Sequence, residues 1–328
     1  MKRIIQIARD KSKFQLSWCI NNICTNHCTY CPDHLHRGKN HNYEWELTRS
    51  FFKRLFTRYK NIHCSISGGE PTVSPHFKEV VDMFYENGHT VGLTTNGVKP
   101  KKYWADMGHK LAYVCFSFHP QFLDKNYLEK AQAASVGTIV KCRIMMDTRY
   151  WDKCVEIYNS AIQLTSLGDW DWSVEPVRIL PDRADLVSLN DMGCDYNQEQ
   201  LDWLTEHSQT YIHTGKNRKP HTNRTAFYYD DGTIEDPGNT NYLIATGQTD
   251  FRGWACNIGL ESMFIDQDGY IKKGNCNQGG RLFHLNDHEN HELPTTAEIC
   301  TIPVCGCNTD VLTSKVPLAN ISREKTNV

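Results

Sequence analysis

The sequence lacks a long hydrophobic run, an excess of charge of either sign and any low-complexity tract. No stretch approaches the roughly 18 apolar residues of a membrane span, and the N-terminal residues MKRIIQIARDKSKF lack the apolar core and cleavage site of a signal peptide. The 36 basic and 38 acidic side chains give a formal net charge of -2, which provides no electrostatic footprint for nucleic-acid binding. We therefore predict a cytoplasmic protein that engages neither a membrane nor a nucleic acid.

Cysteine, by contrast, is abundant, with fourteen in 328 residues. In a reducing compartment such a number favours metal or cluster ligation over a disulfide framework. Four cysteines lie between residues 19 and 31, and five lie between residues 256 and 307. This clustering near both ends of the chain predicts two metal sites.

Between residues 13 and 178, short β-rich segments alternate with longer segments of helical period, which is typical of βα units on a parallel sheet. The predicted strands cover residues 14–20, 62–67, 90–95, 111–118, 138–146 and 172–178. The predicted helices cover residues 47–60, 75–87, 101–108, 124–135 and 151–165. Periodicity alone leaves two α/β folds open, an open doubly wound sheet and a partial (β/α) barrel.

After residue 180 this alternation ends. A helix near 198–210 precedes the polar, basic stretch 214–225, which we interpret as a connector, with a phosphate-, anionic-peptide- or nucleic-acid-binding loop as the alternative. Asp-Gly turns in YYDDGTIED and MFIDQDGYIKK predict two hairpins. We predict two domains, a core over residues 1–235 and a small cysteine-rich domain over residues 236–328.

Three of the N-terminal cysteines, Cys24, Cys28 and Cys31, have the spacing C-x3-C-x2-C directly after the first predicted strand. Three thiolates from one short loop can hold three corners of a cubane iron–sulfur cluster and leave one iron without a protein ligand. A structural zinc knuckle, completed by Cys19 or His27, needs the same kind of ligands. The spacing by itself leaves both sites open.

Two motifs together carry a resemblance to a known family. The loop CTNHCTYC resembles the cysteine loop of the radical S-adenosylmethionine (radical SAM) superfamily, and SGGEP at residues 67–71, about 40 residues later, resembles its glycine-rich turn. In that family the turn contacts the amino group of the methionine moiety. Gly68 and Gly69 allow a close backbone approach, and Glu70 offers an acceptor to an ammonium group.

The resemblance extends over roughly residues 14–180 and implies a partial (β/α)6 TIM-like barrel with its chemistry at the C-terminal ends of the strands. TTNG at 94–97 and SFHP at 117–120 end the third and fourth predicted strands, where the family often contacts the cofactor. Ordinary strand-end turns, and a surface position for Arg143, are the alternatives. The cofactor-binding residues that the resemblance implies are Gly68, Gly69, Glu70, Thr95, Asn96, Ser117 and Arg143.

The resemblance also implies a chemistry. In this family a [4Fe-4S] cluster, here held by Cys24, Cys28 and Cys31, reductively cleaves S-adenosylmethionine to a 5'-deoxyadenosyl radical, which abstracts a hydrogen atom from a C–H bond. The electron comes from a donor such as flavodoxin or ferredoxin. The implied protein is an enzyme of oxidoreductase or transferase type. Cys115 shares a strand face with Ser117, so it either relays a hydrogen atom or packs as a small buried side chain.

The C-terminal cysteines follow the order C-x19-C, a gap, then C-x4-C-x-C. A hairpin turning at Asp268-Gly269 brings the first two together. The arrangement resembles the SPASM and twitch extensions of radical SAM enzymes, but five cysteines rather than seven support a single second [4Fe-4S] cluster, with a structural zinc site as the alternative. The predicted ligands are Cys256, Cys276, Cys305 and Cys307, with Cys300 as a substitute.

Three functions remain open at this point. SPASM and twitch extensions are most often associated with the modification of a peptide or protein, which is the leading hypothesis. No leader-binding domain is evident before the first predicted strand, which favours the alternative of a small-molecule substrate such as a sugar, a nucleotide or another metabolite. A non-catalytic, zinc-stabilised binding module is the alternative from another class.

Overall fold

The structure is a computed structural model and describes residues 2–10, 12–38, 43–122, 124–165, 171–180, 189–207, 211–213, 225–236 and 240–318. The chain forms two compact units. The first unit comprises residues 1–18, 42–64 and 220–328, and the second comprises residues 19–41 and 65–219. The sequence predicted two domains separated by one boundary at residue 235. That division stays a prediction.

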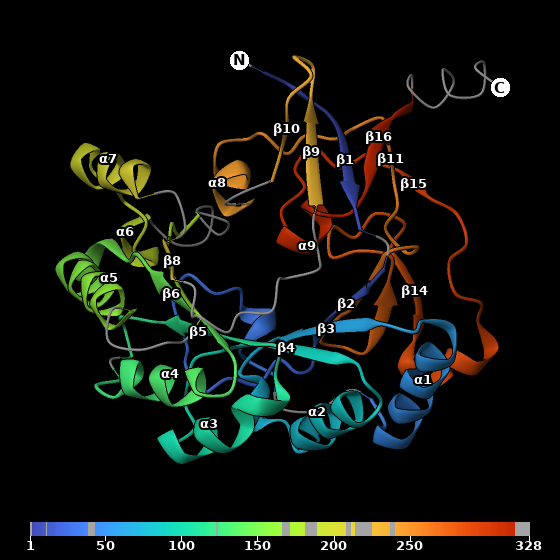
Figure 1. The fold of residues 1–328 in the computed structure, drawn as a ribbon, viewed down its shortest axis with the longest axis horizontal. Helices are drawn as coiled ribbons and strands as arrows, with labels where there is room; N and C mark the ends of the chain where they lie inside the picture. Colours follow the sequence, from blue (N-terminus) through green and yellow to red (C-terminus); the bar gives the residue numbers. More distant parts are fainter. Residues whose placement is uncertain are drawn as a thin grey trace. The chain divides into compact units, whose positions relative to one another are not determined.

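The second unit is an α/β structure with a parallel sheet. After the end of β3 (Ile62–Ser67), the strands β4 (Thr90–Thr95), β5 (Tyr113–Phe118), β6 (Ile139–Met145) and β7 (Trp172–Val177) follow one another in chain order, and β8 (Tyr211–His213) is antiparallel to β7. The intervening helices, drawn along one face of these strands in Figure 1, are α2 (Phe77–Glu86), α3 (Lys101–Met107), α4 (Tyr127–Ser135) and α5 (Trp151–Thr165). Two helices follow β7, α6 (Leu189–Met192) and α7 (Gln198–Glu206).

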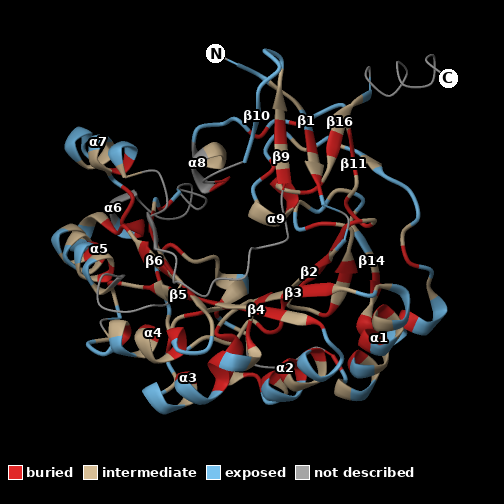
Figure 2. Ribbon diagram, viewed as in Figure 1, coloured by how far each residue is buried: buried red, intermediate tan, exposed pale blue. Residues whose placement is uncertain are grey.

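Alternation of side chains along the strands separates the core from a polar face. On β6, Val140, Cys142 and Ile144 are fully buried, whereas Lys141 and Arg143 between them are only half-buried. The helices supply the other half of this core with large buried side chains, including Trp104 and Tyr127. Figure 2 shows the buried residues along β3 to β6. The half-buried polar side chains on the other face of the strands are therefore available for contacts outside this core.

The first unit holds two sheets. One has the order β10-β9-β1-β16-β11-β15, and its pairings are antiparallel. Its strands are β1 (Ile4–Arg9), β9 (Thr225–Tyr229), β10 (Ile234–Glu235), β11 (Trp254–Cys256), β15 (Glu298–Ile299) and β16 (Lys315–Pro317). The other has the order β14-β13-β12-β2, followed by the start of β3, with β12 parallel to β2. Its strands are β2 (Phe14–Cys19), β12 (Ser262–Ile265), β13 (Tyr270–Lys272) and β14 (Arg281–His284).

Three helices belong to the first unit, α1 (Trp45–Arg58), α8 (Thr240–Ala245) and α9 (Asn308–Val311). Five short 3-10 helices complete the described elements of the chain, at Asp33–Leu35, Pro71–Val73, Gly108–Lys110, Thr148–Tyr150 and Leu285–Asn290. Arg54 of α1 donates hydrogen bonds to the backbone oxygens of His288 and His291, which ties this helix to the last of them.

The predicted fold class is confirmed as an α/β partial barrel followed by a cysteine-rich C-terminal portion. All six predicted strands and five predicted helices are present, and both Asp-Gly hairpins form, as β9 with β10 and β12 with β13. The helix predicted near residues 198–210 is α7. The predicted connector at residues 214–225 lies outside the described residues except for Thr225, the first residue of β9.

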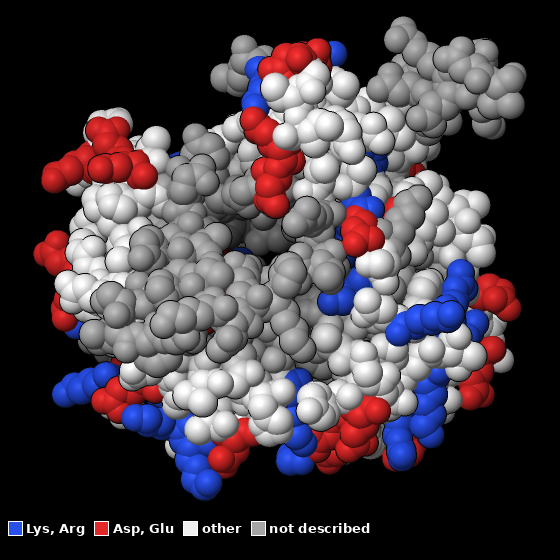
Figure 3. Space-filling view, viewed as in Figure 1, with Lys and Arg blue, Asp and Glu red and all other residues white. Residues whose placement is uncertain are grey.

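No helix in the described part of the chain is long and apolar enough to cross a membrane. On the face shown in Figure 3, basic and acidic side chains are interspersed along the lower edge, and acidic side chains gather over α7. This mixture matches the nearly balanced charge of the sequence.

Candidate functional site

The predicted cysteine loop begins beside the glycine-rich turn, and both belong to the second unit. Three backbone hydrogen bonds join them: Ile20 N donates to Ser67 O at 2.9 Å, Gly69 N to Asn21 O at 2.9 Å, and Glu70 N to Ile23 O at 2.8 Å. The two motifs are therefore one structural feature, because the turn fixes where the cysteine loop starts.

The two glycines of the turn are required by this packing. Gly68 has a φ of +133°, a conformation that side-chain-bearing residues rarely adopt. A Cβ atom at Gly68 would lie 2.3 Å from Asn21 O, and one at Gly69 would lie 2.2 Å from Ile23 O. Both distances are far below van der Waals contact. The close approach that these glycines allow is thus to the cysteine loop, while their predicted contact with a cofactor stays a prediction.

The three cysteine thiols of the loop have distinct surroundings. Cys24 Sγ accepts hydrogen bonds from Asn26 N at 3.4 Å and from Asn96 Nδ2 at 3.7 Å. Burial, together with the smaller effects of the neighbouring Cys31 and Cys24, raises the pKa of the Cys28 thiol to about 12. The thiols are thus close enough to influence one another electrostatically.

The Glu70 carboxylate is completely buried and faces protein groups. Oε1 accepts hydrogen bonds from Thr72 N at 3.0 Å, from Thr72 Oγ1 at 2.6 Å and from Thr95 Oγ1 at 2.8 Å. Oε2 accepts from Asn96 N at 2.7 Å and from Thr95 Oγ1 at 3.0 Å. Burial raises the pKa of this carboxyl, and these donors oppose that rise. In this structure Glu70 joins its own turn to the end of β4, so its predicted contact with a cofactor ammonium group stays a prediction.

Asn96 links this carboxylate to the cysteine loop. Its backbone N–H is held by Glu70, and its side-chain Nδ2 donates to Thr25 Oγ1 at 2.9 Å besides contacting Cys24 Sγ. The predicted cofactor residues Glu70, Thr95 and Asn96 are therefore connected to Cys24 by a continuous chain of hydrogen bonds.

A second group of side chains, which the sequence did not single out, holds the middle of the loop. Thr29 Oγ1 accepts hydrogen bonds from Gln121 Nε2 and from Arg149 Nη2, each at 2.9 Å. The fully buried Asp147 accepts from Gln121 at 3.0 Å and is paired with Arg149 at 2.6 Å. We call Gln121, Asp147 and Arg149 the loop clamp. The only sequence signal for it was the position of Asp147 just after the fifth predicted strand.

The aromatic residue of the cysteine motif has its own partner. The Tyr30 hydroxyl lies 2.8 Å from His119 Nδ1, and the two rings stack with their centroids 6.0 Å apart. Burial lowers the pKa of His119 to about 4, so the imidazole is neutral near pH 7. His119 thus acts as an uncharged partner of Tyr30.

The polar face of the sheet carries the remaining predicted residues. Ser117 on β5, Arg143 on β6 and Glu175 on β7 are neighbours in the strand register. Arg143 Nε donates to Glu175 Oε2 at 2.9 Å. Cys115, two residues before Ser117, is buried and close enough to Arg143 that its charge would raise the pKa of that guanidinium. Cys115 and Ser117 therefore share this face, as their parity predicts.

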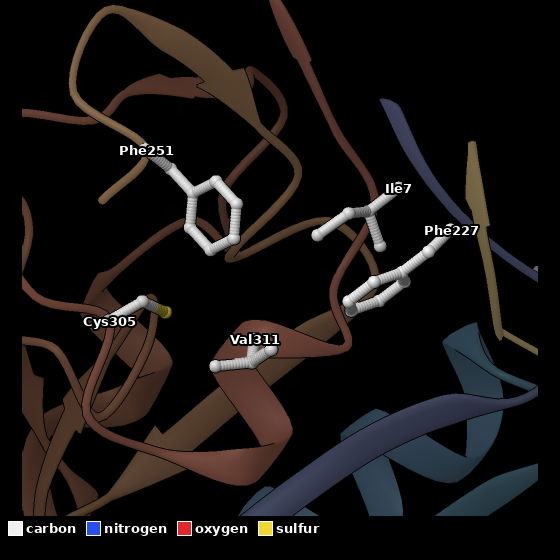
Figure 4. Packing of buried hydrophobic residues seen from close by; sticks show 5 residues of the cluster. All are labelled: Ile7, Phe227, Phe251, Cys305 and Val311. Atoms are coloured by element: carbon white, nitrogen blue, oxygen red, sulfur yellow. The ribbon is translucent and has the colours of Figure 1, made fainter. Parts of the chain in front are cut away.

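The C-terminal cysteines surround a cavity in the first unit. This small cavity is lined by Cys256, Cys276, Cys300 and Cys305, together with Phe251, Asp310 and Lys315 among others. Cys307, a predicted ligand, is not among the lining residues and lies instead at the start of α9. Figure 4 shows Cys305 beside Phe251 and Val311, with Ile7 and Phe227 completing the buried cluster. The lining residues thus include Cys300 and not Cys307, and the choice of the fourth ligand stays a prediction.

The side chains at both sites fit the predicted iron–sulfur clusters in chemical type. Cysteine sulfurs are the usual ligands of such clusters, and hydrogen bonds to those sulfurs, like the one from Asn96 to Cys24, tune them. Within the described ranges, no three His, Cys, Asp or Glu side chains already stand at distances that would hold a single metal ion. The assignment of ligands at both sites stays a prediction.

Residues 18–142 match a family model described as the radical SAM superfamily. Both motifs that carry the resemblance, CTNHCTYC and SGGEP, lie inside this range. The predicted family is thereby confirmed for this part of the chain. No curated protein matches the sequence.

Solved structures with a similar arrangement include two peptide-bound proteins. Streptococcus suis SuiB bound to precursor peptide SuiA gives a TM-score of 0.46 at 13% identity, covering 80% of this chain and 59% of SuiB. The protein anSMEcpe with bound AdoMet and Kp18Cys peptide gives a TM-score of 0.49 at 15% identity, covering 84% of this chain and 78% of anSMEcpe. This chain therefore spans about three fifths of the length of SuiB.

Proposed function

Since residues 18–142 form a radical SAM domain, we propose that this enzyme reductively cleaves S-adenosylmethionine at a [4Fe-4S] cluster held by Cys24, Cys28 and Cys31 and modifies a peptide or protein. The observation that supports the proposal most strongly is that three backbone hydrogen bonds join the cysteine loop to the glycine-rich turn. An electron donor such as flavodoxin or ferredoxin and a cytoplasmic location, where thiols stay reduced, belong to the same proposal.

When bound, the reduced cluster and S-adenosylmethionine supply a 5'-deoxyadenosyl radical for hydrogen-atom abstraction. The work of the chain is to hold the reacting groups still and to exclude other hydrogen donors. Glu70 acts as a positioning residue, because its carboxylate fixes Asn96 and through it Cys24. The loop clamp does the same for Thr29, between Cys28 and Cys31.

The polar face of the sheet in the second unit is the proposed contact surface for cofactor and substrate. Nε of Arg143 is engaged by Glu175, and within the described residues its two Nη atoms have no hydrogen-bond acceptor, so they suit the carboxylate of S-adenosylmethionine. Ser117, the register neighbour of Arg143, adds a hydroxyl. Gly68, Gly69 and Thr95 remain in the proposal as cofactor-binding residues beside them.

The C-terminal cysteines are proposed to hold a second [4Fe-4S] cluster. The cavity supports the set Cys256, Cys276, Cys300 and Cys305 in place of the set that includes Cys307. The resemblance of this cysteine pattern to SPASM and twitch extensions supports a peptide or protein substrate.

The test is anaerobic reconstitution of the full chain, reduction with dithionite and measurement of 5'-deoxyadenosine. We expect formation of 5'-deoxyadenosine in the parent and its loss to background in Cys24→Ala, since three thiolates are needed to hold the cluster. Cys19→Ala is the matched control, because Cys19 is a buried thiol of β2 just before the loop. Absence of 5'-deoxyadenosine from a parent that holds its iron would refute the proposal and favour a non-catalytic binding module.

The substrate class is tested by adding candidate substrates to the same assay. A mixture of synthetic peptides should stimulate 5'-deoxyadenosine formation and should acquire a change in mass, whereas mixtures of sugars and nucleotides should do neither. Stimulation by the small molecules alone would replace the peptide substrate by the small-molecule alternative.

A further inference from the structure

A buried lysine faces the cavity of the C-terminal cysteines. Lys315, the first residue of β16, is only 3% exposed and lines this cavity. It is the register partner of Cys256 on β11. Directly opposite residues on neighbouring antiparallel strands project to the same side of the sheet. The ammonium group and the Cys256 thiol therefore enter the cavity side by side.

The immediate contacts of the Lys315 ammonium group are uncharged. Nζ donates hydrogen bonds to the backbone oxygens of Asp310 and Val311, the latter at 2.9 Å, and it lies 4.7 Å from the centroid of the Phe251 ring. Backbone oxygens and an aromatic face orient and partly stabilise an ammonium group, but they carry no full negative charge.

Two acidic residues lie near this cation, and within the described residues neither forms an ion pair with it. Asp310 also lines the cavity and is close enough to Lys315 to interact with it electrostatically, but its carboxylate accepts the Cys276 N–H at 2.6 Å. Glu298, which is opposite Cys256 on the other neighbouring strand, is ion-paired with Lys273. Among the described residues, no carboxylate lies within ion-pair distance of Lys315. A buried charge without a partner is strongly unfavourable, so a compensating anion is expected in this cavity.

We infer that Lys315 is the internal counter-cation of the second cluster, an inference that rests on the function proposed above. A [4Fe-4S] cluster with four thiolate ligands is an anion, and one-electron reduction adds a further negative charge. A fixed cation beside Cys256 stabilises the reduced form more than the oxidised form. Lys315 is therefore a positioning residue that raises the reduction potential of this cluster and favours its assembly.

The test measures the second cluster by itself, in a variant of the whole 328-residue chain that carries Cys24→Ala, Cys28→Ala and Cys31→Ala. In this background we expect about four irons per chain. K315M removes the charge and keeps the length of the side chain, K315R keeps the charge, and K272M is the matched control, since Lys272 is a half-buried lysine of the same unit that pairs with Asp266. The readouts are iron and sulfide content and the midpoint potential from a reductive titration followed by electron paramagnetic resonance.

We expect K315M to shift the midpoint potential to more negative values, while K315R and K272M stay close to the background protein. An unchanged potential in a K315M protein that keeps its iron would overturn the inference. If K315M binds no iron, the iron content of K315R tests the inference. Iron retained in K315R would support a requirement for the positive charge, whereas iron lost from both variants would overturn the inference. Absence of iron from the background protein itself would refute the second cluster, which is a distinguishable failure of the proposed function.

Discussion

The Glu70 carboxylate belongs to a motif that was predicted to bind a cofactor, but in the structure its hydrogen bonds are to other residues of the protein. Its oxygens accept from Thr72, Thr95 and Asn96, and it is fully buried. In E70Q, an amide NH2 group replaces one of these oxygens and faces donors without an acceptor. Because a buried donor left unpaired carries its full desolvation cost, we expect a loss of about 2 kcal/mol in the free energy of unfolding. Urea denaturation of the iron-free protein measures it.

The matched control is E79Q, since Glu79 is an exposed residue in the first turn of α2. Its unfolding free energy should stay within about 0.5 kcal/mol of the parent. If E70Q is as stable as E79Q, the carboxylate is not a structural junction, and the direct cofactor contact predicted for Glu70 becomes the better explanation of its place in the motif.

His119 makes a pH-dependent contribution at the same scale. Its pKa is about 4 in the folded chain, below the ordinary value of about 6.5 for an unfolded chain. As the pH falls through this interval, the unfolded state takes up a proton that the folded state excludes, so stability decreases. H119Q keeps a hydrogen-bonding partner for Tyr30 but cannot titrate. We expect its melting temperature to fall less than that of the parent between pH 7 and pH 5.

Scanning calorimetry of the parent, H119Q and H109Q across this pH range checks the expectation. His109 is exposed, on the short 3-10 helix after α3, so H109Q should follow the parent. A parallel fall in all three proteins would mean that other groups account for the acid sensitivity.

At the scale of elements, the loop clamp connects the cysteine loop to the residues that follow β5 and β6. Arg149 reaches Thr29 and the backbone oxygen of Asp191 while it pairs with Asp147. R149K keeps a positive charge for Asp147 but loses the planar fork that serves the other two partners. Since outer partners of metal ligands typically contribute 10- to 100-fold, we expect iron release to a chelator to be about 10-fold faster in R149K.

Iron release is followed by the loss of cluster absorbance. K153M is the control, because Lys153 is a half-buried residue of the adjacent α5 that pairs with Glu156 at 2.8 Å. Equal release rates in the parent and R149K would show that the loop holds its cluster without the clamp.

The elements themselves were largely predictable. Strands β2 to β7 and helices α1 to α5 carry strong local patterns, such as the alternation of buried and half-buried residues in β6. Strand β1 was not predicted, because Ile4–Arg9 pairs only with β9 and β16, more than 200 residues away in the sequence. The loop clamp escaped prediction for the same reason, since Gln121 and Thr29 are 92 residues apart. Local patterns predict elements, whereas contacts between distant segments need the folded chain.

The C-terminal cysteines also show that local sequence patterns do not predict contacts between distant segments. The hairpin turn at Asp268-Gly269 was readable, because Gly269 adopts a φ of +85° that suits glycine. The sequence predicted Cys307 as the fourth ligand, with Cys300 as a substitute, and this assignment stays a prediction. That choice depends on the pairing of β15 with β11, which carries Cys300 to the cavity, and on the start of α9, where Cys307 lies.

At the scale of the whole molecule, each proposed ligand set lies entirely within one compact unit. Cys24, Cys28 and Cys31 belong to the second unit, whereas the four cysteines of the cavity belong to the first. Each unit also has its own buried core, exemplified by Phe116 in the second and Phe227 in the first. Since no ligand is shared, assembly of one cluster should not require the other.

We therefore expect about eight irons per chain in the parent after anaerobic reconstitution, about four in Cys24→Ala and about four in Cys256→Ala. Cys300→Ala should resemble Cys256→Ala, because its thiol lines the cavity, and Cys307→Ala should keep about eight because its thiol does not. Iron and sulfide analysis of the five proteins measures this. A parent with about four irons would remove the second cluster, and a loss of all iron in Cys256→Ala would show that the two sites assemble together rather than independently.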